Sequence, residues 1–128
     1  MTMKYSTTLK NAQLDAITTA VGNAGKLRIY DGTKPAFGGA ATTLLAEFTL
    51  GTPFASAASS GVLSPTTPSA VTASAAGTAT WYRVVTSGGT AVIDGDASAS
   101  AGDMQLNTVT IGSGVQVSVT SWTITSGM

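Results

Sequence analysis

The spacing of apolar residues divides the chain into a short helical segment and a long remainder with strand periodicity. Over residues 9–21, apolar side chains recur about every 3.6 residues, which is the period of an amphipathic helix. Ser6 precedes this stretch as an N-cap, and glycines at 22 and 25 end it, because glycine tolerates the left-handed conformation that follows many helices. We expect one N-terminal helix that docks on the rest of the protein, since so short a helix is unstable alone.

From residue 26 onward the apolar period changes to two, which indicates strands separated by turns. Alternation predicts strands over residues 26–30, 43–50, 78–86, 90–96, 104–111 and 115–125, with short edge strands near 61–64 and 70–74. Turn residues occupy 31–35, 87–89 and 112–114, residues 37–41 read as a mobile loop, and prolines interrupt the irregular stretch 51–77.

These elements predict an all-β fold with one short N-terminal helix. We expect an antiparallel β-sandwich of about seven or eight strands. A jelly roll is favoured over an immunoglobulin-like sandwich because long loops precede tight hairpins. The chain has the length of one domain, in which residues 1–25 form an arm and helix and residues 26–128 form the sandwich.

The composition removes several classes of chemistry. The chain contains no Cys and no His, which excludes disulfides, thiolate metal sites and cysteine nucleophiles, and also the commonest general base. Glu47 is the only Glu, and nothing marks it and an Asp as the paired carboxylates of a glycosidase. We therefore expect a protein that is not an enzyme and needs no cofactor.

The charge balance favours association with other proteins. Charged residues make up 9% of the chain, six basic against six acidic, and the mean hydropathy is +0.28. Such a surface neither attracts nucleic acid nor discourages association. No apolar run reaches the length of about 18 residues that spans a bilayer. The N-terminus lacks the apolar core of a signal peptide, so we expect synthesis in the cytoplasm of a cell.

Two groups of side chains suggest ligand sites, and each has a simpler structural explanation. Asp94, Asp96 and Asp103 offer oxygens suited to Ca²⁺, but the spacing lacks the remaining ligands of a calcium loop, and we interpret Asp94 and Asp96 as the end of a strand. The aromatic residues Tyr30, Trp81, Tyr82 and Trp122 would stack on sugars if exposed. We favour a core position for them, as is usual for strand aromatics in small β proteins.

Several segments together resemble a family of small virion structural proteins of tailed bacteriophages. The segments are residues 9–17 (LKNAQLDAI), 25–35 (GKLRIYDGTKP), 79–84 (ATWYRV), 92–95 (VIDG), 102–107 (GDMQLN) and 115–121 (VQVSVTS). The resemblance covers nearly the whole chain and rests on a pattern of strands and turns, with no catalytic motif. It implies a protein of the phage particle.

Within that family we favour a capsid decoration, or cement, protein. The resemblance then implies the major capsid protein and further copies of the chain, as a dimer or trimer, as partners, and the capsid surface of the virion as its location. The predicted contact elements are the N-terminal arm, the loop 33–41 and the stretch 53–68, and the predicted interface residues are Tyr5, Lys34, Phe37, Phe54 and Arg83. The alternatives are a tail, baseplate or fibre-associated protein, with glycan binding as an option, and a cell-wall hydrolase.

Overall fold

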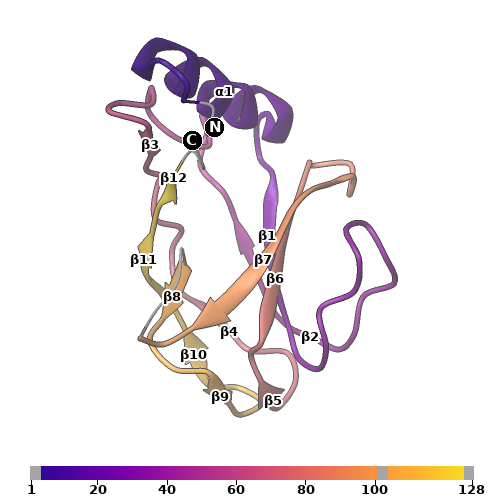
Figure 1. Ribbon diagram of the computed structural model, residues 1–128. Helices are drawn as coiled ribbons and strands as arrows, with labels where there is room; N and C mark the ends of the chain where they lie inside the picture. The colour runs from indigo at the N-terminus through magenta and orange to yellow at the C-terminus, as the bar shows by residue number, and fades with distance from the viewer. Residues whose placement is uncertain (1–3, 101–103, 126–128) are drawn as a thin grey trace.

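One helix and a curled, mixed β-sheet organise the chain (Figure 1). The computed structural model describes residues 4–100 and 104–125. Helix α1 (Thr7–Val21) begins after Ser6, whose hydroxyl oxygen accepts a hydrogen bond of 3.1 Å from the N–H of Leu9. It ends at Gly22, which has a φ of +70° and donates its N–H to Thr18. Both ends of the predicted helix are therefore confirmed.

The strands in the described residues are more numerous and shorter than the sequence predicts. They are β1 (Lys26–Tyr30), β2 (Leu44–Thr49), β3 (Val62–Leu63), β4 (Val71–Thr72), β5 (Gly77–Thr78), β6 (Trp81–Val85), β7 (Ala91–Ser98), β8 (Met104–Leu106), β9 (Thr110–Ile111), β10 (Gln116–Val117), β11 (Val119–Trp122) and β12 (Ile124–Thr125). The predicted strand at 104–111 is split into β8 and β9, and the one at 115–125 into β10, β11 and β12.

The principal sheet has six strands in the order β11-β8-β7-β6-β1-β2. Strand β7 links its two parts, because its first residues pair with β6 and its last two pair with β8. The β7–β8 pair is parallel, with Ala97 beside Met104, and every other pair in the sheet is antiparallel. The expectation of a purely antiparallel arrangement is therefore wrong: β8 runs beside β7 in the same direction and is not the return arm of a hairpin.

The all-β character with one short N-terminal helix is confirmed. The strand order does not establish a sandwich or a jelly roll. Alongside the six-stranded sheet, the described residues form three two-stranded pieces, which pair β10 with β4, β12 with β3 and β5 with β9. In Figure 1 the helix lies across one end of the sheet, and the loop between β1 and β2 projects on the side away from β3 and β12.

The core lies on one face of strands β2, β1, β6 and β7. Successive cross-strand rows place Phe48, Leu27 and Val84 side by side, and then Ala46, Ile29, Tyr82 and Gly95. The ring of Tyr82 lies directly over Gly95, where an added Cβ would come within 2.5 Å of the ring.

Aromatic rings join this face to the irregular stretch. Trp122 packs edge-on against Phe54 and Tyr82, with ring centroids 5.3 and 5.8 Å apart. All four predicted core aromatics are buried: Tyr82 and Trp122 belong to the core cluster, whereas Tyr30 and Trp81 form a buried cross-strand pair on the opposite face of the sheet.

Helix α1 is fixed to this core by apolar and polar contacts. Leu14 and Val21 are buried in the same cluster as the sheet residues. From the neighbouring helix surface, Asp15 accepts a hydrogen bond of 2.7 Å from the N–H of Ala58, and Asn11 accepts one of 3.0 Å from Gly61. These contacts tie the irregular stretch before β3 to the helix, which explains how a segment without long strands is held in place.

Candidate interaction surface

The face of the sheet opposite the core carries a row of charges across four strands. The strand register aligns Glu47 of β2, Arg28 of β1, Arg83 of β6 and Asp94 of β7. Because side chains alternate between the two faces of a strand, these residues point away from the core residues that flank them. We call this surface, together with Tyr30, Trp81 and Asp96 in the adjacent row, the polar face.

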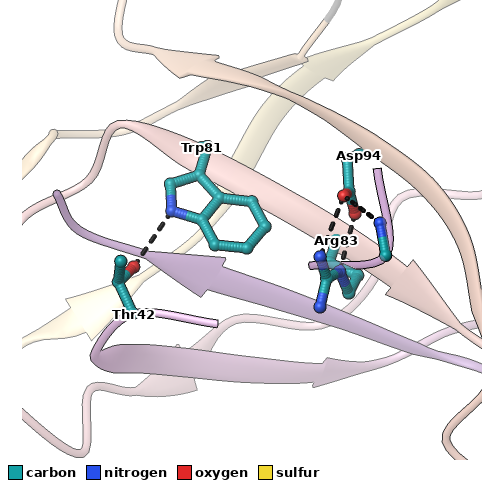
Figure 2. A network of polar contacts seen from close by, with 5 residues as sticks. Thr42, Trp81, Arg83 and Asp94 are labelled. Atoms are coloured by element: carbon teal, nitrogen blue, oxygen red, sulfur yellow. Dashed lines mark hydrogen bonds and ion pairs between the residues drawn. The ribbon is translucent and has the colours of Figure 1, made fainter. Parts of the chain in front are cut away.

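Arg83 and Asp94 form a buried, two-pronged ion pair on the polar face (Figure 2). Arg83 Nε lies 2.7 Å from Asp94 Oδ1, and Nη2 lies 2.9 Å from Oδ2, while the two side chains are 10% and 5% exposed. The hydrogen bond from Arg83, aided by one from the backbone N–H of Gly38, lowers the pKa of Asp94. The same bond raises the pKa of Arg83, so both groups stay ionised near neutral pH.

The second ion pair stands at the open end of the row. Arg28 Nε lies 2.7 Å from Glu47 Oε2, and these side chains are 33% and 38% exposed. Hydrogen bonding to Glu47 raises the pKa of Arg28. Arg28 and Arg83 lie directly opposite each other on neighbouring strands, a position in which like charges repel. A carboxylate on each outer side of the two arginines offsets this repulsion.

Trp81 occupies the next row and is enclosed on several sides. Its ring stacks on Tyr30 with centroids 4.5 Å apart and an interplanar angle of 20°, and Arg83 Cζ lies 5.1 Å from the ring centroid. The indole N–H donates to the carbonyl of Asp31 and to Thr42 Oγ1, each at 3.0 Å (Figure 2). A ring with these partners and no exposed area does not offer a platform for sugar stacking.

Residues 31–43, which connect β1 to β2, lie against the polar face, and we call them the strap. At its base, Asp31 and Thr43 exchange hydrogen bonds, from Asp31 N to the Thr43 carbonyl and from Thr43 N to Asp31 Oδ1. Thr42 Oγ1 donates to the Asp31 carbonyl, and Thr80 Oγ1 donates to the Gly32 carbonyl at 2.6 Å. The two ends of the strap are thereby joined to each other and to the start of β6.

The middle of the strap is held by the carboxylates of β7. The N–H of Gly38 donates to Asp94 Oδ2 at 3.2 Å, and Lys34 Nζ lies 2.9 Å from Asp96 Oδ1. The sequence predicts a mobile loop at residues 37–41, whereas the structure ties this segment to the sheet through Gly38. Asp94 therefore has two functions, since it neutralises Arg83 and accepts a hydrogen bond from the strap.

Phe37 is the strap's largest apolar side chain, and it faces solvent. It is 64% exposed, more than Leu9 at 44% and Val115 at 43%, the other large apolar side chains exposed in the described residues. Leu9 lies on α1, and Val115 lies in the turn before β10, so the three do not belong to one element. In Figure 1, α1 and β10 lie apart from the loop between β1 and β2 that carries Phe37.

The structure divides the predicted interface residues into two groups. Phe37 and Lys34 lie together on the strap, and Tyr5 lies half-buried before α1. Phe54 and Arg83 are not surface residues: Phe54 is fully buried against Trp122, and Arg83 is enclosed by Asp94 and Trp81. Neither side chain lies at the surface of the free chain, and the interface function of all five residues stays a prediction.

Sequence reasoning missed the part that Asp94 plays. The sequence analysis placed Asp94 at a strand end. The turn predicted at residues 87–89 was the available signal, because a hairpin with that turn brings Asp94 beside Arg83. Asp94 and Asp96 are engaged by cations of the chain, and within residues 4–100 and 104–125 no group of three acidic, His or Cys side chains is arranged to hold a metal. Asp103 lies outside the described residues.

Comparison with known proteins gives no match to any family model, curated protein or solved structure. No helix in the part of the chain that the structure describes is long and apolar enough to cross a membrane.

Proposed function

We propose that this chain is a structural protein of a tailed-phage particle that binds the outer surface of the capsid and stabilises contacts between major capsid protein subunits. The resemblance of residues 9–121 to small virion structural proteins supports the particle setting. The strap supports the binding role, and it is the single observation that carries the proposal: polar contacts hold its backbone, and its one large apolar side chain is left to solvent.

The charges near the strap support binding through surface contact. Arg28, Arg83 and Lys34 are each paired with a carboxylate of the same chain. Charged groups that are matched within the chain stabilise its shape, and they leave recognition to apolar and hydroxyl groups. This pattern suits a protein that works by fitting against a neighbour.

A clamp of this kind stabilises a capsid without chemistry. A protein that binds the assembled shell more tightly than the separated subunits shifts the equilibrium toward the shell by mass action. Modest contacts that are repeated at symmetry-related positions add to a large total avidity, especially when the binding protein is itself a dimer or trimer. The proposed partners are therefore the major capsid protein and further copies of this chain.

The test is the copy number of the protein in purified phage particles, measured by quantitative mass spectrometry against the major capsid protein. We expect hundreds of copies, in a simple ratio to the shell subunit. A handful to a few dozen copies would move the protein to the tail or baseplate. Absence from the particle would reject both structural functions and return the enzyme hypothesis to consideration.

A further inference from the structure

We infer that Phe37 is the anchor of the capsid contact and that it enters an uncharged, apolar pocket repeated on the subunits of the shell. This docking role rests on the proposed capsid-binding function and adds the contacting residue and the chemistry of the partner site. Three features carry it: the fixed backbone of the strap, the matched charges that hold its middle, and the small area of the Phe37 ring.

The backbone of the strap is held without help from the Phe37 ring. Gly38, the next residue, donates its N–H to Asp94, and Asp94 is itself held by Arg83. The base of the strap is closed by Asp31 and Thr43. The ring is therefore presented from a preorganised loop, which lowers the entropy lost when a partner immobilises it. Aromatic residues, Phe among them, are enriched in protein interfaces.

The charges around Phe37 indicate the character of the pocket. Lys34 is paired with Asp96, and Asp94 with Arg83, so the charges that hold the middle of the strap are matched. Asp31, at the base of the strap, accepts a hydrogen bond from the N–H of Thr43. Lys26, the remaining cation of this sheet face, stands at its far end and donates to Thr49. A partner that matches this surface is itself apolar and uncharged, and its binding should depend little on salt, since screening acts on charge–charge attraction.

The area of the Phe37 ring indicates a repeated partner and argues against a free second copy. A buried aromatic side chain covers about 150–250 Å², whereas a stable pair of proteins buries about 800 Å² on each partner. The other exposed apolar side chains, Leu9 and Val115, lie on other elements and do not extend the patch. The ring of Phe37 alone is therefore too small to hold two free copies together, but many such rings on a symmetric shell add their affinities.

The experiment measures binding to purified shells from particles that lack the protein. Wild type and the variants Phe37→Ala, Leu9→Ala and Val115→Ala are mixed with shells and quantified by sedimentation at low and high salt. The two control variants also remove a large exposed apolar side chain, and urea unfolding verifies that all four proteins are folded. We expect Phe37→Ala to weaken binding about 10- to 100-fold, and the controls and added salt to change it less than about threefold.

Other results would overturn the inference. Folded Phe37→Ala that binds shells as tightly as wild type would reject Phe37 as the anchor, while leaving capsid binding intact. A strong loss of wild-type binding in high salt would reject the uncharged pocket. Self-association of free wild type that Phe37→Ala abolishes, measured by analytical ultracentrifugation, would assign the ring to a second copy. Wild type that does not bind shells would reject the proposed function and the anchor with it.

Discussion

The two faces of strands β2, β1, β6 and β7 are built from alternate residues of the same chain segments, yet different forces hold them. On the core face, Phe48, Leu27 and Val84 are fully buried side by side. On the polar face, the neighbouring row pairs Arg28 with Glu47 and Arg83 with Asp94. The core face is stabilised by area removed from water. On the polar face, the pairing of Arg83 with Asp94 avoids the cost of leaving either charge buried alone.

The polar face itself changes along its row. The strap reaches the Arg83–Asp94 end, where the side chains are buried, and the Arg28–Glu47 end remains half-exposed. Breaking an ion pair lowers the free energy of unfolding more where the pair is enclosed than where water screens it. The comparison therefore predicts a graded series of mutational effects, from the core face through the enclosed pair to the open pair.

The largest effect is expected on the core face. Phe48→Ala should lower the free energy of unfolding by about 3–5 kcal/mol, because it removes a fully buried ring and leaves a cavity. Urea denaturation measures this change. The matched control is Phe37→Ala, which removes the same ring from an exposed position and should change stability by about 0.5 kcal/mol or less. Equal losses in the two variants would contradict the assignment of the core face.

The enclosed ion pair comes next. Arg83→Met should lower the free energy of unfolding by about 3 kcal/mol, because it leaves the carboxylate of Asp94 buried without its cation. The double variant Arg83→Met, Asp94→Leu should recover part of that loss, since it removes the unmatched charge as well. If Asp94→Leu lowers the free energy of unfolding of the Arg83→Met variant as much as it lowers that of wild type, the two side chains are not coupled.

The same pair gives the stability a pH dependence. The pKa of Asp94 is lower in the folded chain than in the unfolded chain, where it is about 4. Its contribution to stability is therefore fully present above that unfolded value and is lost as the pH falls through the lower folded value. Wild type should lose more stability than Asp94→Asn when urea unfolding is compared at pH 6 and at about pH 2 to 3. Identical losses would show that Asp94 does not carry this linkage.

The smallest effect is expected at the open end of the row. Glu47→Gln should change the free energy of unfolding by about 0.2–1 kcal/mol, because water already screens the pair with Arg28. A double-mutant cycle with Arg28→Gln isolates the interaction. A coupling free energy as large as that of the Arg83–Asp94 pair would contradict the gradient along the polar face.

The parts of the fold that could be predicted are those with local signals. Ser6 and Gly22 bound α1 as the sequence indicates, because a side-chain cap and a left-handed glycine act within one helical turn. The range predicted for the first strand, 26–30, is that of β1. Its two-residue period also separates Leu27 and Ile29 from Arg28 and Tyr30, as the register confirms.

The parts that could not be predicted depend on distant partners. Alternation runs through residues 104–111, but Asn107 leaves the strand, where its side chain donates to the carbonyl of Gln116 and accepts from the N–H of Ser118. In the same way, β11 pairs with β8 and β12 pairs with β3, so the last predicted strand changes partner midway. A pattern of apolar residues predicts which face of a strand is buried, but it does not predict where the chain changes from one pairing strand to another.

The candidate site shows the same division. Phe37 and Lys34 could be chosen from a loop that is irregular and carries one large apolar residue. The same reasoning wrongly placed Phe54 at the surface, because an irregular stretch can still supply side chains to the core. The hydrogen bond from the N–H of Gly38 to Asp94 could not be predicted from the sequence, because it joins residues 56 positions apart.

The most direct test of the central claim is a cryo-electron microscopy difference map between particles with and without this protein. The proposal predicts extra density at every symmetry-related position on the capsid exterior, oriented so that residues 31–43 meet the shell and the ring of Phe37 enters an apolar pocket on the major capsid protein. Density in which the strap faces solvent would contradict the strap as the docking element. Density confined to the tail would contradict the capsid function itself.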